Sequence, residues 1–268
     1  MKKKKIFLFL VLITIFITGC GNSKEVQPLY DKNGEPIFVE KDNYDKIFSN
    51  ANDYKGKFVK MSGKIFGDVE KGDNSIAFQM YTDIEKYSKD IAVYYSGDIS
   101  LKSDDYVELT GYVYGYMEGS NAFGGYVSSP AIMATELKKS DYKSVVRPTI
   151  KEKTYNDKII NQFGCIIKIT KVEYAEKETR LYVTAENQSD SEFRLYAYSS
   201  KIIQNSKQYD YESNYDAEYQ KLQDDLQPGV KSDGILVFPP IEDGPFKFVI
   251  DGYNTSYYIN INDFTFDL

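Results

Sequence analysis

Histidine and tryptophan are absent from the 268 residues, and cysteine occurs only at Cys20 and Cys165. Without histidine, no Ser-His-Asp or Cys-His relay can form, and the commonest nitrogen ligand of zinc and copper is missing. The sequence contains no complete EF-hand, no P-loop, no dinucleotide-binding glycine motif and no nucleophile elbow. We therefore expect no catalytic residue, no metal site and no cofactor, and a protein that is not an enzyme.

Positive charge is also scarce: 33 Lys and Arg stand against 40 Asp and Glu, which gives a formal net charge of −7. Residues 1–19 hold four of the lysines and no acidic residue, so the rest of the chain carries −11. Non-specific binding to nucleic acid depends on clustered Lys and Arg. Nucleic acid is therefore an unexpected partner.

The N-terminal segment has the pattern of an export signal. Four lysines, Lys2–Lys5, precede an apolar run from Ile6 to Ile17, as in the charged and apolar regions of a secretory signal. The run is shorter than the roughly 20 residues that a membrane-spanning helix needs. A plain cleaved signal or a short membrane anchor is the alternative to the lipoprotein signal described next.

That motif is Thr18-Gly19-Cys20, which resembles the lipobox of bacterial lipoproteins. The resemblance implies cleavage after Gly19, lipid on the Cys20 thiol, and a protein held on the extracytoplasmic side of the cell membrane. Two or more acyl chains, at about 0.8 kcal/mol per buried methylene, are enough to hold a domain at a membrane. By contrast, Cys165 lies in the apolar run FGCIIKIT, which predicts a buried, unreactive thiol.

Turn-forming residues and changes in composition divide the rest of the chain into segments. Two prolines and a Lys-Asn-Gly-Glu turn make residues 20–42 a flexible tether after the signal at 1–19. Residues 43–142 combine one short helix with five strand-like runs, and 160–268 are strand-like throughout. The polar segment 143–159 is interpreted as a linker between two domains.

Both domains resemble families found on bacterial surface lipoproteins. DYKGK with VKMSGKI, LTGYV and PAIMA resembles the tRNA-anticodon-like OB-fold domains, over residues 44–140. VTAENQSDSEFRL and LQPGVKSDGILVFPPI resemble immunoglobulin-like extracellular domains of the DUF4352 type, similar to the telokin-like group; the matching residues are Asn187, Pro228, Gly229, Gly234 and Phe238. The expected fold class is all-β: a small OB-like barrel with one short helix, followed by an immunoglobulin-like β-sandwich.

A tyrosine-rich stretch is the candidate site. Tyr112, Tyr114 and Tyr116 are two residues apart, so in a regular strand they share one face. With Tyr126 they could form a stacking platform for an oligosaccharide or a nucleic-acid base. Packing inside the barrel or at a domain interface is the alternative interpretation.

The sequence therefore predicts a non-catalytic binding or interaction module at the cell envelope, whose partner is an envelope protein or glycan. A hydrolase of envelope polymers that uses two carboxylates is one alternative, because the required separation is spatial and invisible in sequence. Binding of single-stranded nucleic acid through the OB-like domain is another, and it requires a basic groove.

Overall fold

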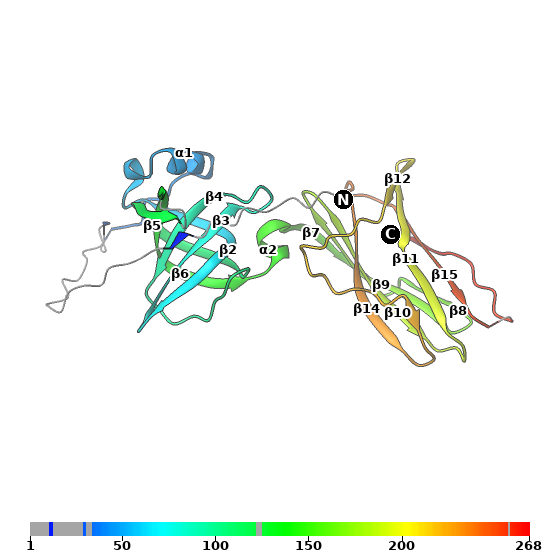
Figure 1. Ribbon diagram of the computed structural model, residues 1–268. Coiled ribbons are helices and arrows are strands. Elements are labelled where there is room, and N and C mark those ends of the chain that lie inside the picture. The colour runs from blue at the N-terminus through cyan, green and yellow to red at the C-terminus, as the bar shows by residue number, and fades with distance from the viewer. Residues whose placement is uncertain (1–10, 13–28, 31–33, 122–124, 257) are drawn as a thin grey trace. The chain divides into compact units, whose positions relative to one another are not determined.

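The computed structural model describes residues 11–12, 29–30, 34–121, 125–256 and 258–268. The chain is mostly β-structure, as the sequence predicts, and divides into two compact units, unit 1 (Met1–Asp141) and unit 2 (Tyr142–Leu268) (Figure 1). The expected lipidation residue, Cys20, lies outside the described residues. Among the helices that are described, none has the length and apolarity needed to cross a bilayer.

Unit 1 contains one sheet and a short helical segment. The helical elements are η1 (Lys41–Asn43), α1 (Tyr44–Ser49) and η2 (Ala51–Tyr54). The strands are β1 (Val11–Leu12), β2 (Phe58–Gly72), β3 (Ser75–Asp83), β4 (Ser88–Tyr95), β5 (Tyr106–Asn121) and β6 (Tyr126–Ser140).

The strand pairings of unit 1 close on themselves. β2 pairs with β3, β3 with β4, β4 with β6 in parallel, β6 with β5, and β5 again with β2. Alternate residues of β3, Ile76, Phe78 and Met80, are buried in the core that this ring encloses, as period-two alternation requires. Ile47 of α1 is fully buried in the same core, so this helix packs one apolar side chain against the sheet.

The expected tether, residues 20–42, extends too far toward the C-terminus, because its last residues belong to the fold of unit 1. Val39 is buried in the core of unit 1, and Phe38 forms a parallel bridge with Phe58. The first residues of β2 extend beyond β3, whose pairing begins at Lys64. Unpaired backbone groups on such an edge are costly; the Val39 amide donates to the Phe58 carbonyl at 2.8 Å, and the Phe58 amide donates to Ile37 at 2.8 Å.

Unit 2 consists of two sheets and one helical turn, α2 (Tyr142–Val146). One sheet contains β7 (Thr149–Thr154), β8 (Ile159–Gln162), β9 (Cys165–Ala175), β10 (Thr179–Asn187) and β14 (Lys231–Phe238). The other contains β11 (Phe193–Gln204), β12 (Lys207–Asp210), β13 (Asp225–Leu226), β15 (Lys247–Asn254) and β16 (Phe264–Asp267).

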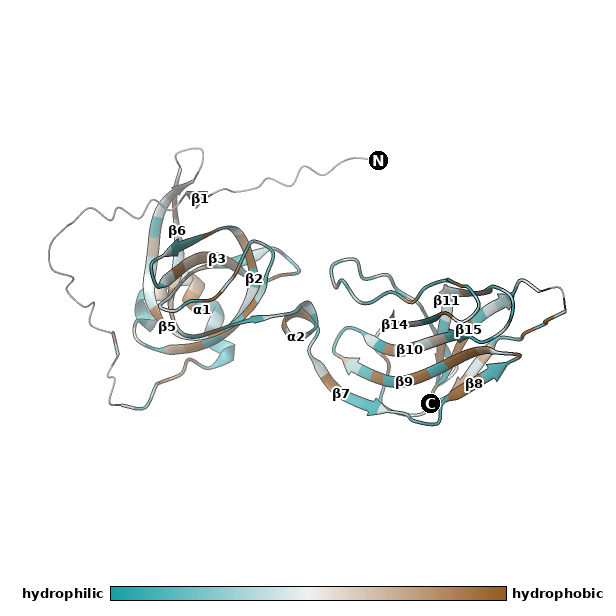
Figure 2. Cartoon of the chain, turned by 90° about the horizontal axis from the view of Figure 1, so that it is seen from below, coloured by the Kyte–Doolittle hydropathy of each residue, from teal (hydrophilic) through white to brown (hydrophobic). Residues whose placement is uncertain are grey.

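The two sheets of unit 2 bury their inner faces in one core. Ile167 and Leu181 from the first sheet and Phe248 and Phe264 from the second belong to a single buried cluster. Apolar bands recur along β9 and β10 (Figure 2), in keeping with strands that bury alternate residues. Cys165 is a buried free thiol in this core, and burial raises its pKa.

The segment 143–159 is not a plain linker. It contains all of α2 except Tyr142, and it contains β7, which pairs with β9 from Thr149 to Thr154. All six side chains of β7 are exposed, because it is an edge strand held by backbone hydrogen bonds. Charged residues on such an edge prevent pairing with other chains, and they give the segment the composition of a loop.

Candidate binding surface

Tyr112 belongs to a compact aromatic cluster on the outer face of unit 1, formed with Tyr30, Phe38 and Phe58. Phe58 lies directly opposite Tyr112 across the β2–β5 pair. The ring centroids of Tyr30 lie 4.9 Å from those of Phe58 and Tyr112, and Phe38 lies 5.7 Å from Phe58. Residues from the expected tether thus complete a surface that begins on the strands.

Tyr114 lies next to this cluster but points to solvent. It is 43% exposed, and it occupies a bulge, since the register of β5 against β6 shifts between Val113 and Gly115. A bulge bends the strand and changes the direction of the side chains that follow. Tyr114 therefore lies at the edge of the cluster, where its ring is accessible to solvent.

Tyr116 lies apart from the other two because the bulge interrupts the alternation. Its ring packs against the core of unit 1, and its hydroxyl accepts a hydrogen bond from the Ala51 amide at 3.1 Å. Tyr116 therefore has the packing role that was the alternative interpretation, and it fixes η2 against β5.

Tyr126 is also separate. It lies opposite Ser120 near the far end of the β5–β6 pair, seven residues along β6 from Met133, the partner of Tyr112, or roughly 23 Å at the usual strand rise. Its hydroxyl donates to Glu118, which raises the pKa of Tyr126. Of the four predicted tyrosines, the structure brings only Tyr112 and Tyr114 together.

A groove of about 440 Å³ runs across the same face of β2, β5 and β6. Its lining mixes apolar side chains with polar ones and with charges of both signs: Lys41, Lys60, Met61, Ser62, Glu108, Leu109, Thr110, Glu136, Leu137 and Lys138. Lys60 connects the groove with the aromatic cluster, because its Nζ lies 5.4 Å from the ring centroid of Phe38. We call the cluster, Tyr114 and this groove the aromatic groove.

The carboxylate of Glu108 in the aromatic groove is held in its charged form. Ser140 donates to it at 2.7 Å, and Lys138 lies 3.0 Å away. The hydrogen bond from Ser140, helped by Lys138, lowers the pKa of Glu108 although burial opposes this. The groove therefore offers a fixed acceptor near neutral pH, which suits binding rather than proton transfer.

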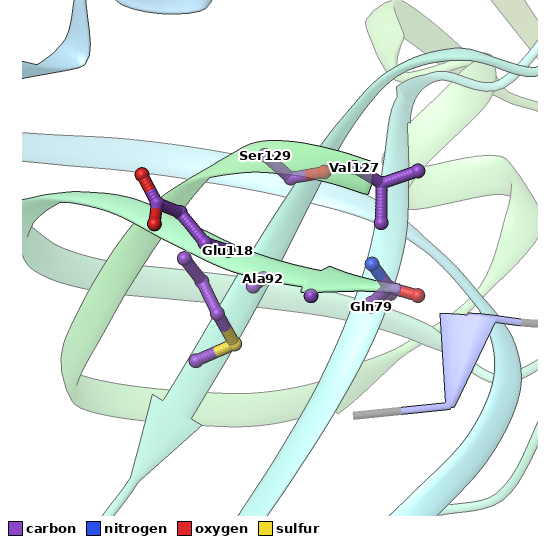
Figure 3. A pocket seen from close by; sticks show the side chains of 7 residues that line it. Gln79, Ala92, Glu118, Val127 and Ser129 are labelled. Carbon is purple, nitrogen blue, oxygen red and sulfur yellow. The ribbon is translucent and has the colours of Figure 1, made fainter. Parts of the chain in front are cut away.

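A second hollow in unit 1 is too small for a ligand. It measures about 10 Å³, the space of a single water, and is lined from β3, β4, β5 and β6 by Gln79, Ala92, Met117, Glu118, Gly119, Val127 and Ser129 (Figure 3). The distal β5–β6 pair lies against β3 and β4 there, and Ser129 donates to Asp90 at 2.5 Å. This hollow is a packing gap between strand pairs.

A buried cluster of titratable groups lies in unit 2, and sequence reasoning missed it. Arg180 is fully buried; its Nε donates to Glu173 at 2.9 Å, and its guanidinium also donates to Glu178 at 2.7 Å and Thr149 at 2.7 Å. Tyr219 donates to Glu178 at 2.5 Å. The strand pattern alone assigns these charged residues to a solvated face, so no sequence signal marked them.

The acids of this cluster are all engaged by cations or hydroxyls, which indicates a structural role. Burial would raise the pKa of Glu173, but hydrogen bonds from Lys171 and Tyr182 and the charges of Arg180 and Lys143 lower it to about 2. A general acid would need a raised pKa. Asp224 has a raised pKa, because partial desolvation and the charge of the neighbouring Asp225 disfavour its charged form, but it is exposed to solvent and lines neither hollow described above.

Within the described residues, no group of three or more Cys, Asp or Glu side chains is placed to hold a metal ion. No family model matches the chain, and no curated protein matches it. Two solved structures are similar at low identity. The yjhA protein from Bacillus subtilis is 14% identical over 36% of this chain and 79% of that chain, with a TM-score of 0.30.

The second is a functionally unknown protein from Listeria monocytogenes EGD-e, 10% identical over 42% of this chain and 88% of that chain, with a TM-score of 0.32. Likeness at this level assigns neither a ligand nor an activity.

Proposed function

We propose that this protein is a lipoprotein of the cell envelope, anchored through Cys20, which binds an extended glycan in the aromatic groove of unit 1 without transforming it. The observation that carries the proposal is the continuity of an aromatic cluster with a groove of mixed charge. Aromatic faces stack on sugar rings, and the carboxylates and lysines beside them can exchange hydrogen bonds with hydroxyls.

The closed order of strand pairing supports the OB-like barrel that we propose for unit 1. Antiparallel pairs β2–β3–β4, a parallel β4–β6 pair and closure through β5 form a five-stranded ring, and OB-fold barrels have five strands and bind oligosaccharides or oligonucleotides. For unit 2 we propose an immunoglobulin-like sandwich of the DUF4352 type, supported by two sheets around one core.

Glycan is favoured over nucleic acid because of the charges that line the groove. Lys41, Lys60 and Lys138 stand beside Glu108 and Glu136, so the lining has a net charge of only +1, and Lys138 is already paired with Glu108. A phosphate backbone needs uncompensated cations. A neutral polymer that makes hydrogen bonds does not.

Tyr114→Ala tests this function directly. With the chain from Gly21, which keeps both cores whole, we expect retention on insoluble cell-wall glycan to fall at least tenfold while the melting temperature stays unchanged, because the ring is exposed. Tyr87→Ala, which removes another exposed tyrosine of unit 1, is the matched control. Unchanged retention by Tyr114→Ala would remove the aromatic groove as the site.

A further inference from the structure

Unit 2 carries a second group of tyrosines on the outer face of the sheet that contains β11 and β15. In the strand register, Arg194 lies opposite Tyr253 and Tyr196 lies opposite Asp251, so these four side chains share one face. Their inward neighbours Phe193, Leu195 and Ile250 fill the core. The outer four therefore contribute nothing to that core.

The rings of this group form a ladder. Tyr196 and Tyr253 are stacked, with centroids 5.8 Å apart and planes at 27°, and Tyr198 stands at 74° to Tyr196 with its centroid at 5.9 Å. The guanidinium of Arg194 lies 5.9 Å from the centroid of Tyr253. Tyr198 is 68% exposed, so its ring is accessible to a ligand.

A bulge produces this arrangement. The β11–β15 register shifts between Tyr196 and Lys201, and hydroxyl groups hold the irregular segment: Ser199 donates to the Tyr196 carbonyl at 2.9 Å, and Ser200 donates to the Ala197 carbonyl at 2.6 Å. Bulges of this kind redirect side chains at functional sites. The exposure of Tyr198 is thus built into the backbone.

Asp251 supplies an unused acceptor at the centre of the group. Its Oδ2 receives a long contact from Ser199 at 3.4 Å, whereas its Oδ1, shielded from solvent in this conformation, accepts no hydrogen bond from the described residues. A buried acceptor without a donor is unfavourable. A donor that enters between the rings would recover that energy.

The charges around the rings select the class of ligand. Glu192 and Asp225 both contact Arg194, so the group has three carboxylates, including Asp251, against one guanidinium. An anionic polymer is repelled by this balance. A proline-rich peptide stacks on aromatic faces but offers few donors, whereas a sugar ring offers both an apolar face and several hydroxyl donors.

We propose that Tyr196, Tyr198 and Tyr253, with Arg194 and Asp251, form a binding site for a neutral pyranose oligosaccharide. We call these five residues the tyrosine ladder. The proposal needs neither the aromatic groove of unit 1 nor the lipid on Cys20.

Calorimetric titration of the chain from Gly21 with chitotetraose, cellotetraose and maltotetraose tests the tyrosine ladder, in a Tyr114→Ala background that removes the other site. We expect at least one of the three to bind, Tyr198→Ala and Tyr253→Ala each to weaken that binding about fivefold or more, and Asp251→Asn to weaken it less. Tyr215→Ala, at an 84% exposed tyrosine elsewhere in unit 2, should bind like the parent.

Two outcomes would overturn the tyrosine ladder. One is the absence of binding for all three sugars; the other is binding that Tyr198→Ala leaves unchanged, since the exposure of this ring ensures that its removal does not unfold the sheet. Binding of a proline-rich or lysine-rich decapeptide in place of the sugars would also reject the proposal. Retention on cell-wall glycan distinguishes the two sites. Tyr114→Ala reports on the aromatic groove while the tyrosine ladder is intact, and Tyr198→Ala reports on the tyrosine ladder while the aromatic groove is intact.

Discussion

Gly115 decides where the tyrosines of β5 point. Its φ is +126°, a conformation that residues with a Cβ avoid, and an added Cβ would lie 2.5 Å from Lys55 Cε and 2.9 Å from Asn52 Oδ1. The bulge at this position leaves Tyr114 at the surface and places Tyr116 against Ala51. One backbone conformation thus separates an accessible ring from a structural one.

We expect Gly115→Ala to lower the free energy of unfolding of unit 1 by about 2 kcal/mol, the order of the strain at a disfavoured φ. Gly119→Ala is the matched control in the same strand, because no atom lies within 4 Å of an added Cβ there. Urea unfolding of both variants measures the difference. Equal stability of the two would show that the bulge does not require glycine.

Asn187 and Asp251 differ in whether their buried polar atoms have hydrogen-bond partners. Asn187 is fully buried, and its amide donates to the Ser191 and Leu226 carbonyls at 2.7 and 2.8 Å, while its Oδ1 accepts from the Ser189 amide. The sequence predicts this role, because Asn bonds local backbone at strand ends. Asp251 has one oxygen without a donor, which is why we assign it to a site and Asn187 to the fold.

The helical turn α2 is attached to unit 2 by its own side chain and by the backbone that follows it. Lys143 lies 3.3 Å from Glu173 of β9, and the Arg147 carbonyl accepts from Arg180 of β10 at 2.9 Å. Glu173 is shared by Lys143, Lys171 and Arg180. This carboxylate therefore joins the segment after residue 141 to the sheet.

Glu173→Gln is expected to lower the free energy of unfolding of unit 2 by about 3 kcal/mol at neutral pH, because it removes a charge partner of the buried Arg180 and of the partly exposed Lys143 and Lys171. The folded pKa of about 2 lies below the ordinary value of 4.5. The stabilisation is therefore complete above about pH 4.5 and is lost as the pH falls through about 2.

Denaturant unfolding at pH 7 and across this acid range measures both effects. Glu152→Gln is the control, since its side chain is 57% exposed on β7 and lies 3.7 Å from Lys171; we expect a change below about 0.5 kcal/mol. If Glu173→Gln keeps the acid sensitivity of the parent between pH 4.5 and 2, other carboxylates hold the segment.

The two units place two aromatic surfaces on one acidic chain. The aromatic groove of unit 1 and the tyrosine ladder of unit 2 both combine rings with carboxylates and few free cations. The charge of −11 beyond residue 19 agrees with ligands that are not polyanions. Binding of glycan by either surface would serve a protein that faces the cell envelope.

Strand-like runs in the sequence were enough to predict that the chain is mostly β-structure, and β3, β9 and β10 lie in the parts described as strand-like. They could not predict β7, because an exposed edge strand has no buried face, nor the position of Tyr116, because a bulge shifts the pattern. The Arg180 cluster and the tyrosine ladder depend on which strands lie side by side, and that register is set by the core rather than by local sequence.

The central claim is that lipid on Cys20 holds a binding protein at the outer face of the membrane. Growth with labelled palmitate, followed by isolation of the wild-type chain and of Cys20→Ala, tests it most directly. We predict label on the wild-type protein in the membrane fraction and none on Cys20→Ala. An unlabelled wild-type protein, or equal label on both chains, would contradict the account.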